Sequence, residues 1–152
     1  MKYKIKKGKH FAQFTINRLF PFTCSKISGS VMFDSNCLVK ESIPGWNKLT
    51  GISGTKIHKD SGRLVWRSKG NQISIAGYVY NNGERKEIEI TTIPVNMWFS
   101  YKIEHYKDVW RLSVGGKVVI MSGNLGFFKF RCYPYFGGQS TAPVDMVIEL
   151  GR

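Results

Sequence analysis

The sequence predicts an all-β domain of two packed sheets, and three observations indicate it. Apolar and polar residues alternate with a period of two in about ten short segments. Two dipeptides typical of tight hairpins, Asn82-Gly83 and Gly115-Gly116, separate neighbouring segments. Aromatic residues make up 14% of the chain, and such residues favour half-buried, pleated surfaces. Regularly spaced short strands of this kind are typical of an antiparallel sandwich.

The length of 152 residues fits one domain, residues 1–152. No window holds an apolar helical stripe that is free of glycine, proline or β-branched clusters. The predicted strands are residues 2–6, 26–33, 63–67, 72–80, 85–92, 97–105, 109–114, 117–121, 127–133 and 144–150.

The first strand alternates lysines with Tyr3 and Ile5, which predicts an edge strand protected by charge. Residues 26–33 place Ile27, Val31 and Phe33 on one face. The segment 34–60 is the least regular, and we expect long loops or short edge strands there. Trp46 lies in it directly after Pro44-Gly45, which slightly favours exposure.

The central strands carry the most informative alternation. In residues 63–67, Leu64 and Trp66 lie opposite Arg63 and Arg67. In residues 72–80, the isoleucines and Val79 lie opposite Tyr78 and Tyr80. After the Asn82-Gly83 turn, Ile88 and Ile90 alternate with Glu87 and Glu89. One face of these strands is therefore expected to be buried and the other solvated.

The later strands alternate in the same way, and the last one is expected to tie the C-terminus into a sheet. Trp66, Trp98 and Trp110 are predicted core residues.

The formal net charge of +13 draws polyanions such as nucleic acid, anionic lipid, acidic polysaccharide or an acidic protein surface. A purely solubilising role for the charge stays open. Aromatic and basic residues mix in residues 2–14 and 127–135, as in single-strand binders, but no nucleic-acid motif accompanies them. Nucleic acid is therefore an unlikely partner.

The cysteines, Cys24, Cys37 and Cys132, show no metal-binding spacing and are expected to be reduced, although a Cys24–Cys37 disulfide stays open. No secretory leader and no apolar run of ~18 residues is visible, which predicts cytoplasmic synthesis and no membrane span.

Enzyme signatures are sparse. The sequence has no nucleophile elbow, phosphate loop or dinucleotide fingerprint, and its three histidines are scattered, so we expect no metal and no cofactor. Glu87 and Glu89 form the one tight carboxylate pair, and a solvated strand face explains them.

A polysaccharide lyase is harder to dismiss. It can use a tyrosine or histidine as base and an arginine that neutralises a uronate. His58, Arg63, Arg67, Tyr78 and Tyr80 offer those groups.

Four stretches resemble concanavalin A-like jelly-roll proteins of the Bacteroidetes group and their phages. They are residues 47–52 (NKLTGI), 58–67 (HKDSGRLVWR), 77–83 (GYVYNNG) and 135–143 (YFGGQSTAP). The resemblance implies a jelly-roll β-sandwich of two antiparallel sheets. Its superfamily includes lectins, carbohydrate-binding modules, glucanases and lyases. This chain lacks the three-carboxylate strand of the glucanases, the metal-binding Asp/Asn loops of legume-type lectins, and the Gln-Ile/Val-His strand of alginate-lyase-like members.

These signals together favour a non-catalytic, lectin-like carbohydrate-binding module, with an acidic glycan as a candidate ligand. They lean against an enzyme. One alternative is a phage virion decoration or fibre protein that binds capsid proteins or forms homo-oligomers, and another is an acidic-polysaccharide lyase. The candidate ligand-binding residues are Trp46, His58, Arg63, Arg67, Tyr78, Tyr80 and Tyr135.

Overall fold

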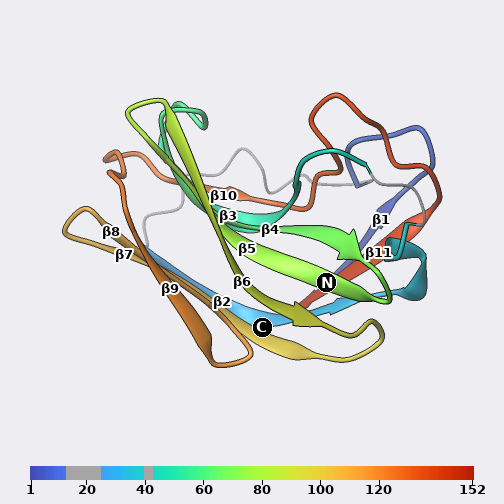
Figure 1. Cartoon of the computed structure of the whole chain (residues 1–152). Helices are drawn as coiled ribbons and strands as arrows, with labels where there is room; N and C mark the ends of the chain where they lie inside the picture. The colour runs from blue at the N-terminus through green and yellow to red at the C-terminus, as the bar shows by residue number, and fades with distance from the viewer. Residues whose placement is uncertain (13–24, 40–42) are drawn as a thin grey trace.

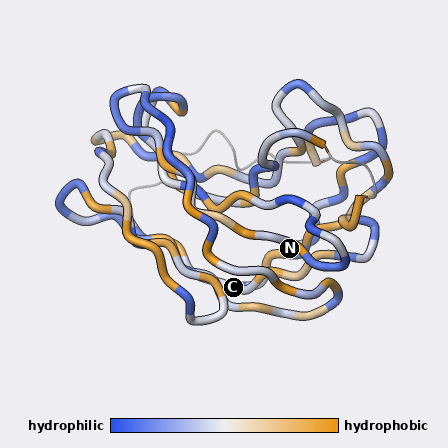
Figure 2. Tube along the Cα trace, viewed as in Figure 1, coloured by the Kyte–Doolittle hydropathy of each residue, from blue (hydrophilic) through white to orange (hydrophobic). Residues whose placement is uncertain are grey.

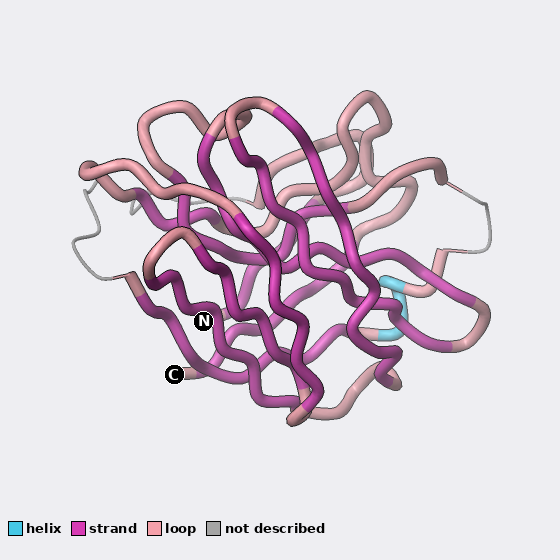
Figure 3. Tube along the Cα trace, turned by 60° about the vertical axis from the view of Figure 1, so that its left-hand side comes forward, coloured by secondary structure: helices cyan, strands magenta, loops and turns pink. Residues whose placement is uncertain are grey.

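Two antiparallel sheets pack face to face in the computed structural model, which describes residues 1–12, 25–39 and 43–152 (Figure 1). Apart from one short 3-10 turn, η2 (Ser35–Cys37), regular structure in the described residues is strand (Figure 3). The strands are β1 (Lys2–Ile5), β2 (Lys26–Phe33), β3 (Asn47–Ser53), β4 (Asp60–Lys69), β5 (Gln72–Asn81), β6 (Glu84–Ile93), β7 (Phe99–Tyr106), β8 (Val109–Val114), β9 (Lys117–Ser122), β10 (Phe130–Cys132) and β11 (Met146–Gly151).

The six-stranded sheet has the order β1-β11-β2-β7-β8-β9, and the five-stranded sheet has the order β10-β3-β4-β5-β6. The chain crosses between the sheets four times, after β2, β6, β9 and β10. This arrangement confirms the predicted jelly-roll sandwich. The prediction that residues 2–6 form an edge strand is also confirmed, because β1 ends the six-stranded sheet.

Period-two alternation assigns the two faces of each strand. In β4, Leu64 and Trp66 belong to the core between the sheets, whereas Val65 packs with residues on the opposite face. Figure 2 shows this alternation of hydrophobic and hydrophilic residues along the strands, and it shows that the hairpin tips are hydrophilic. The five-stranded sheet therefore has an outer face that is separate from the core.

The core depends on close contact between the sheets at Gly62. A Cβ atom on this residue would lie 2.2 Å from Cε3 of Trp110, so the indole fits only because glycine has no side chain. Trp66, Phe33 and Phe136 form the neighbouring aromatic layer, and all are fully buried.

Both hairpin predictions are confirmed. Asn82 and Gly83 have φ values of 50° and 87°, and Gly115 and Gly116 have φ values of 55° and 83°. Two consecutive positive φ values match the right-handed twist of the paired strands, which are β5 with β6 and β8 with β9.

Three expectations about single elements are wrong. Residues 34–60 were expected to hold loops or short edge strands, but β3 lies inside the five-stranded sheet between β10 and β4. Trp98 is about half exposed rather than core, because it lies just before β7. The strand expected at residues 127–133 is confined to Phe130–Cys132, and Phe127 and Phe128 are exposed.

Cys37 is buried, and its thiol donates to Asp34 Oδ1 and the Val147 carbonyl. Cys24 lies outside the described residues. In the part of the chain that the structure describes, no helix is long and apolar enough to cross a membrane.

Replacing Gly62 with alanine should destabilise the fold by about 2 kcal/mol or more, because the new methyl group overlaps the Trp110 ring. Urea unfolding of Gly62→Ala and of the unmodified protein, analysed with the same m-value, measures the difference in the free energy of unfolding. Gly138→Ala is the control, since a Cβ there meets nothing within 4 Å, and it should change stability by less than about 0.5 kcal/mol. Equal effects of the two variants would contradict this packing argument.

Candidate functional site

A row of directly paired residues crosses the outer face of the five-stranded sheet. Gly51 on β3 pairs with Arg63 on β4, which pairs with Tyr78 on β5, which pairs with Glu87 on β6. Directly opposite residues of antiparallel strands share a face. The register therefore gathers these side chains at the centre of the outer face.

Arg63 is the central side chain of this row and is only 3% exposed. Its stem lies over β3 because Gly51 has no side chain, and a Cβ there would lie 2.4 Å from the Arg63 Cγ. Its guanidinium carbon lies 5.1 Å from the Tyr78 ring centroid and 5.8 Å from that of Tyr80. The Nε and Nη2 atoms are buried and have no hydrogen-bond partner in the part of the chain that the structure describes.

Lys48 reaches the same place from β3. Its Nζ donates to the Trp46 carbonyl at 2.8 Å and lies 4.8 Å from the Tyr78 ring centroid. Burial, followed by the positive charges of Arg63 and Arg85, lowers the pKa of Lys48 to about 8. A share of this amine is therefore uncharged near neutral pH.

Two phenols line the cluster. The rings of Tyr78 and Tyr80 meet edge to face with centroids 5.6 Å apart. Burial raises the pKa of Tyr78, and hydrogen bonding with Tyr80 adds to the rise, so Tyr78 keeps its proton at neutral pH. The His58 ring meets Tyr80 edge-on at 5.3 Å, and the Arg85 guanidinium lies 5.8 Å from the Tyr78 ring.

The carboxylates on this face already have cationic partners. Glu87 pairs with Arg85 at 3.3 Å, and Glu89 pairs with Lys69 at 2.9 Å and with Arg67 at 3.9 Å. The hydrogen bond from Lys69 is the main reason that the pKa of Glu89 is lowered. Arg63 and Lys48, at the centre of the face, have no carboxylate partner among the described residues.

The outer face of the six-stranded sheet differs in charge. Its lysines lie next to carboxylates, as in the pairs Lys2–Glu149, Lys26–Glu104 and Lys102–Glu104. Arg63 and Lys48 on the five-stranded sheet, by contrast, have no such carboxylate neighbour in an ion pair among the described residues.

The structure brings most of the predicted ligand-binding residues to one face. Arg63, Tyr78, Tyr80 and His58 meet in one cluster. Hereafter the "cationic cluster" means Lys48, Arg63, Tyr78, Tyr80 and Arg85.

The remaining predicted residues flank the cationic cluster. Arg67 stacks on the Trp46 ring, with its guanidinium carbon 4.1 Å from the ring centroid. Tyr135 pairs with Lys48 through two backbone hydrogen bonds, and its ring stacks on His10. Trp46 is half-buried rather than openly exposed.

Sequence reasoning missed both Lys48 and Arg85 as members of the cationic cluster. A bulge between Lys48 and Thr50 breaks the alternation of β3, so the strand gave no period-two signal. Arg85 could have been found from the Asn82-Gly83 turn. Residues at equal distances before and after a two-residue turn pair with each other, which places Arg85 opposite Tyr80.

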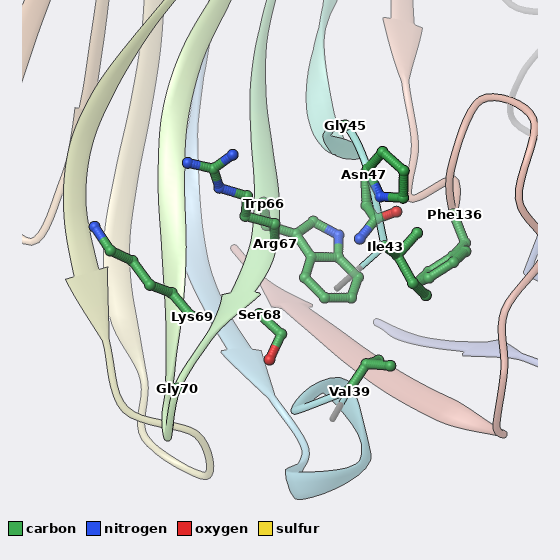
Figure 4. Close-up of a pocket in the computed structure, with 11 residues that line it drawn as sticks. Val39, Ile43, Gly45, Asn47, Trp66, Arg67, Ser68, Lys69, Gly70 and Phe136 are labelled. Carbon is green, nitrogen blue, oxygen red and sulfur yellow. The ribbon is translucent and has the colours of Figure 1, made fainter. Parts of the chain in front are cut away.

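A pocket of about 390 Å³ lies near the other end of β4 (Figure 4). Trp66 and Phe136 form its apolar wall, with Asn47 beside them, and Figure 4 shows Arg67 and Lys69 pointing away from that wall. The pocket offers little chemistry, and it does not include the cationic cluster. Among the described residues, no three His, Cys, Asp or Glu side chains are grouped so that they could hold a metal ion.

Neither a protein-family model nor a curated protein matches the sequence. Solved structures do match. Alginate lyase AlyC3 aligns with a TM-score of 0.65 at 14% identity, over 98% of this chain and 71% of that one. An alginate lyase from Klebsiella pneumoniae aligns with a TM-score of 0.59 at 13% identity, over 84% of this chain and 57% of that one.

An endo-1,3-beta-glucanase (laminarinase) catalytic domain from Thermotoga petrophila RKU-1 aligns with a TM-score of 0.57 at 10% identity, over 99% of this chain and 74% of that one. The chain spans little more than half of the Klebsiella enzyme. These likenesses confirm the concanavalin A-like jelly-roll fold.

The comparisons correct the functional prediction. The matching proteins are enzymes that are named for acting on polysaccharides. The prediction of a non-catalytic, lectin-like module was therefore wrong, and so was the preference for a protein without enzymatic activity. The matches favour the lyase alternative, and they give no support to a phage virion role or a capsid assembly.

Replacing Arg63 with methionine should raise the free energy of unfolding by about 1 kcal/mol. The substitution removes a buried cation that has no anionic partner among the described residues. Arg67→Met on the same face is the control. Arg67 is exposed, and its loss should change stability by less than about 0.5 kcal/mol. Urea unfolding of the two variants and the unmodified protein measures these differences. A clear loss of stability in Arg63→Met would show that Arg63 mainly stabilises the fold.

The Lys48 amine should titrate near pH 8, which NMR of the lysine side-chain signals can follow. In Arg63→Met the pKa should rise, because a neighbouring positive charge is gone, but it should stay below 10.5 because burial remains. Arg67→Met should leave the Lys48 pKa unchanged. A Lys48 pKa at the ordinary lysine value in the unmodified protein would refute the cluster's electrostatics.

Proposed function

We propose that this chain is a polysaccharide lyase that cleaves an acidic, uronate-containing chain on the outer face of the five-stranded sheet. The observation that carries the proposal is Arg63, a buried arginine whose Nε and Nη2 have no hydrogen-bond partner among residues 1–12, 25–39 and 43–152. Burying a cation without an anion costs free energy, and a bound carboxylate would relieve that cost.

The chemistry of the face favours elimination over hydrolysis. Glycoside hydrolysis generally needs two carboxyl groups, one of them a protonated acid with a raised pKa. Glu89 instead has a lowered pKa and two cationic partners, and it shares one edge strand with Glu87. Elimination from a uronate needs a cation for the carboxylate, a base and a proton donor, and the cationic cluster supplies all three kinds of group.

Each side chain then has one role. Arg63 and Arg85 flank Tyr78 and hold the uronate carboxylate by charge and hydrogen bonds. Uncharged Lys48 is the base, because its pKa of about 8 leaves a lone pair available. Tyr78 is the proton donor, since its raised pKa keeps the phenol protonated.

The reaction is a β-elimination. The Lys48 amine takes the proton from the carbon next to the carboxylate, and the electron pair of that bond forms a carbon–carbon double bond. The bond from the adjacent carbon to the glycosidic oxygen breaks, and this oxygen receives the proton of the Tyr78 phenol. No water is consumed. The Arg63 and Arg85 side chains stabilise the negative charge that develops on the carboxylate in the transition state.

Activity should rise as the pH increases through about 8, because Lys48 must lose its proton to act as base. The test is degradation of soluble polyuronates of several sugar types, followed by the ultraviolet absorbance of the new conjugated double bond from pH 6 to 10. A decline in activity through pH 8 would assign Lys48 to carboxylate binding instead.

Lys48→Met, Arg63→Met and Tyr78→Phe should each lower kcat/KM by about 100-fold or more, in line with the loss of an acid, a base or a charge stabiliser. Arg111→Gln, on β8 of the other sheet, is the control and should keep full activity. Cleavage that yields reducing ends without the double bond would indicate a hydrolase. Failure of the folded protein to degrade any polyuronate would also overturn the proposal.

A further inference from the structure

Four connecting segments meet at one end of the sandwich. The "loop end" comprises residues 54–59, the Asn82-Gly83 turn, the β7–β8 connection with its flanking Tyr106, and residues 123–129. The Gly83 amide donates to the Lys59 carbonyl at 3.4 Å, and the Gly123 amide donates to the Asp108 carbonyl at 2.9 Å. Figure 1 shows the β5–β6 and β7–β8 hairpin tips at this same end.

Aromatic side chains project from the loop end into solvent. Phe127 is 91% exposed, Phe128 is 61% exposed and Tyr106 is 70% exposed. Ile57 adds a smaller exposed apolar side chain. Large aromatic residues that are this exposed and lie on adjoining loops are typical of an interaction surface.

The projecting segment is held in place from below. The Asp60 carboxylate accepts a hydrogen bond from the Gly126 amide at 3.0 Å. The Asn124 amide donates to Asn81 Oδ1 at 3.4 Å. Gly54 packs so closely on Asp60 that a Cβ would lie 1.9 Å from its Oδ2. The two phenylalanines are therefore presented on an anchored loop.

Four lysines lie on the same connecting segments as the aromatic side chains or on adjoining ones. Lys56 and Lys59 lie on one loop, Lys107 lies 5.2 Å from the centre of the Tyr106 ring, and Lys129 follows Phe128. None of these four lysines is in an ion pair with another described residue. The acidic residues of this end are Glu84 and Asp108, together with Asp60, which is engaged in the loop anchor. Positive charge therefore exceeds negative charge here.

We propose that the loop end docks on an anionic lipid surface. Phe127, Phe128 and Tyr106 lie at the headgroup level, and the lysines contact the lipid phosphates. Exposed aromatic side chains accompanied by lysines are a combination that binds interfaces of anionic lipid. A sugar chain fits this surface poorly, because the Phe127 and Phe128 rings are perpendicular, with an interplanar angle of 90°, and cannot stack on one flat sugar face together.

This docking leaves the outer face of the five-stranded sheet open. The cationic cluster lies on the face of the sandwich, whereas the projecting rings lie at its end. Lipid binding therefore does not depend on the proposed lyase activity, and either property can fail without the other.

The test is sedimentation of the full chain with vesicles of phosphatidylcholine alone, or of phosphatidylcholine mixed with phosphatidylserine. Binding is expected only with phosphatidylserine present and should weaken with added salt. Phe127→Ala/Phe128→Ala should lower the partition coefficient about tenfold or more, because two apolar side chains no longer enter the interface. Lys56→Glu/Lys59→Glu should lower it by a similar factor.

Two controls separate the loop end from the overall charge of +13. Lys6→Glu/Lys117→Glu changes the net charge equally but at positions outside the loop end, and it should retain most of the binding. Ile120→Ser removes from β9 an apolar side chain that is 67% exposed, close to the 61% of Phe128. This variant should bind vesicles as the unmodified protein does. Absence of binding, equal losses in both charge variants, or full binding by Phe127→Ala/Phe128→Ala would overturn the proposal.

Discussion

The register of β4 is the constraint on which the rest of the structure depends. One face of this central strand supplies Gly62, Leu64 and Trp66 to the core, and the other supplies Arg63 to the outer face. A shift by one residue would place the arginine in the core and the tryptophan in solvent. The Gly62–Trp110 contact fixes this register, because a glycine is required where the indole crosses the strand. Core packing thus determines where the guanidinium lies.

The cationic cluster has a cost that the fold must offset. Arg63 and Lys48 lie close together, and burial and mutual repulsion lower the Lys48 pKa. Cation–π contacts with Tyr78 and Tyr80 return part of that free energy, about 0.5–1 kcal/mol for each contact. An uncompensated buried charge is more often a property of binding and catalytic sites than of structural positions, because those sites are completed by a ligand.

Much of the fold could be predicted from the sequence, because alternation and turn chemistry act locally. The strand Gln72–Asn81, its Asn82-Gly83 turn and the returning strand were predictable almost to the residue. The strand Asn47–Ser53 was not, because its bulge removes the period-two pattern and its place inside the sheet depends on distant partners. Trp98 shows the same limit, since residue type alone does not determine burial at the end of a strand.

The site was predictable in part, for a related reason. Alternation put Arg63, Tyr78 and Tyr80 on one face, but it carried no information on whether that face binds or reacts. That distinction depends on Lys48, whose pKa is lowered first by burial and then by Arg63 on β4 and Arg85 on β6. A face with only aromatic and planar polar groups suits sugar binding, which is why a lectin-like module was the natural first expectation.

The addition of a partly uncharged amine beside a protonated phenol changes the chemistry that the face supports. Proton removal next to a carboxylate requires a base whose pKa is near the working pH, and it requires cations that stabilise the charge as it forms. Burial is the largest cause of the lowered Lys48 pKa, and the positive charges of Arg63 and Arg85, the arginines assigned to the substrate carboxylate, lower it further. Burial of the Lys48 amine belongs to the fold itself, so this cause of the lowered pKa remains when a carboxylate binds.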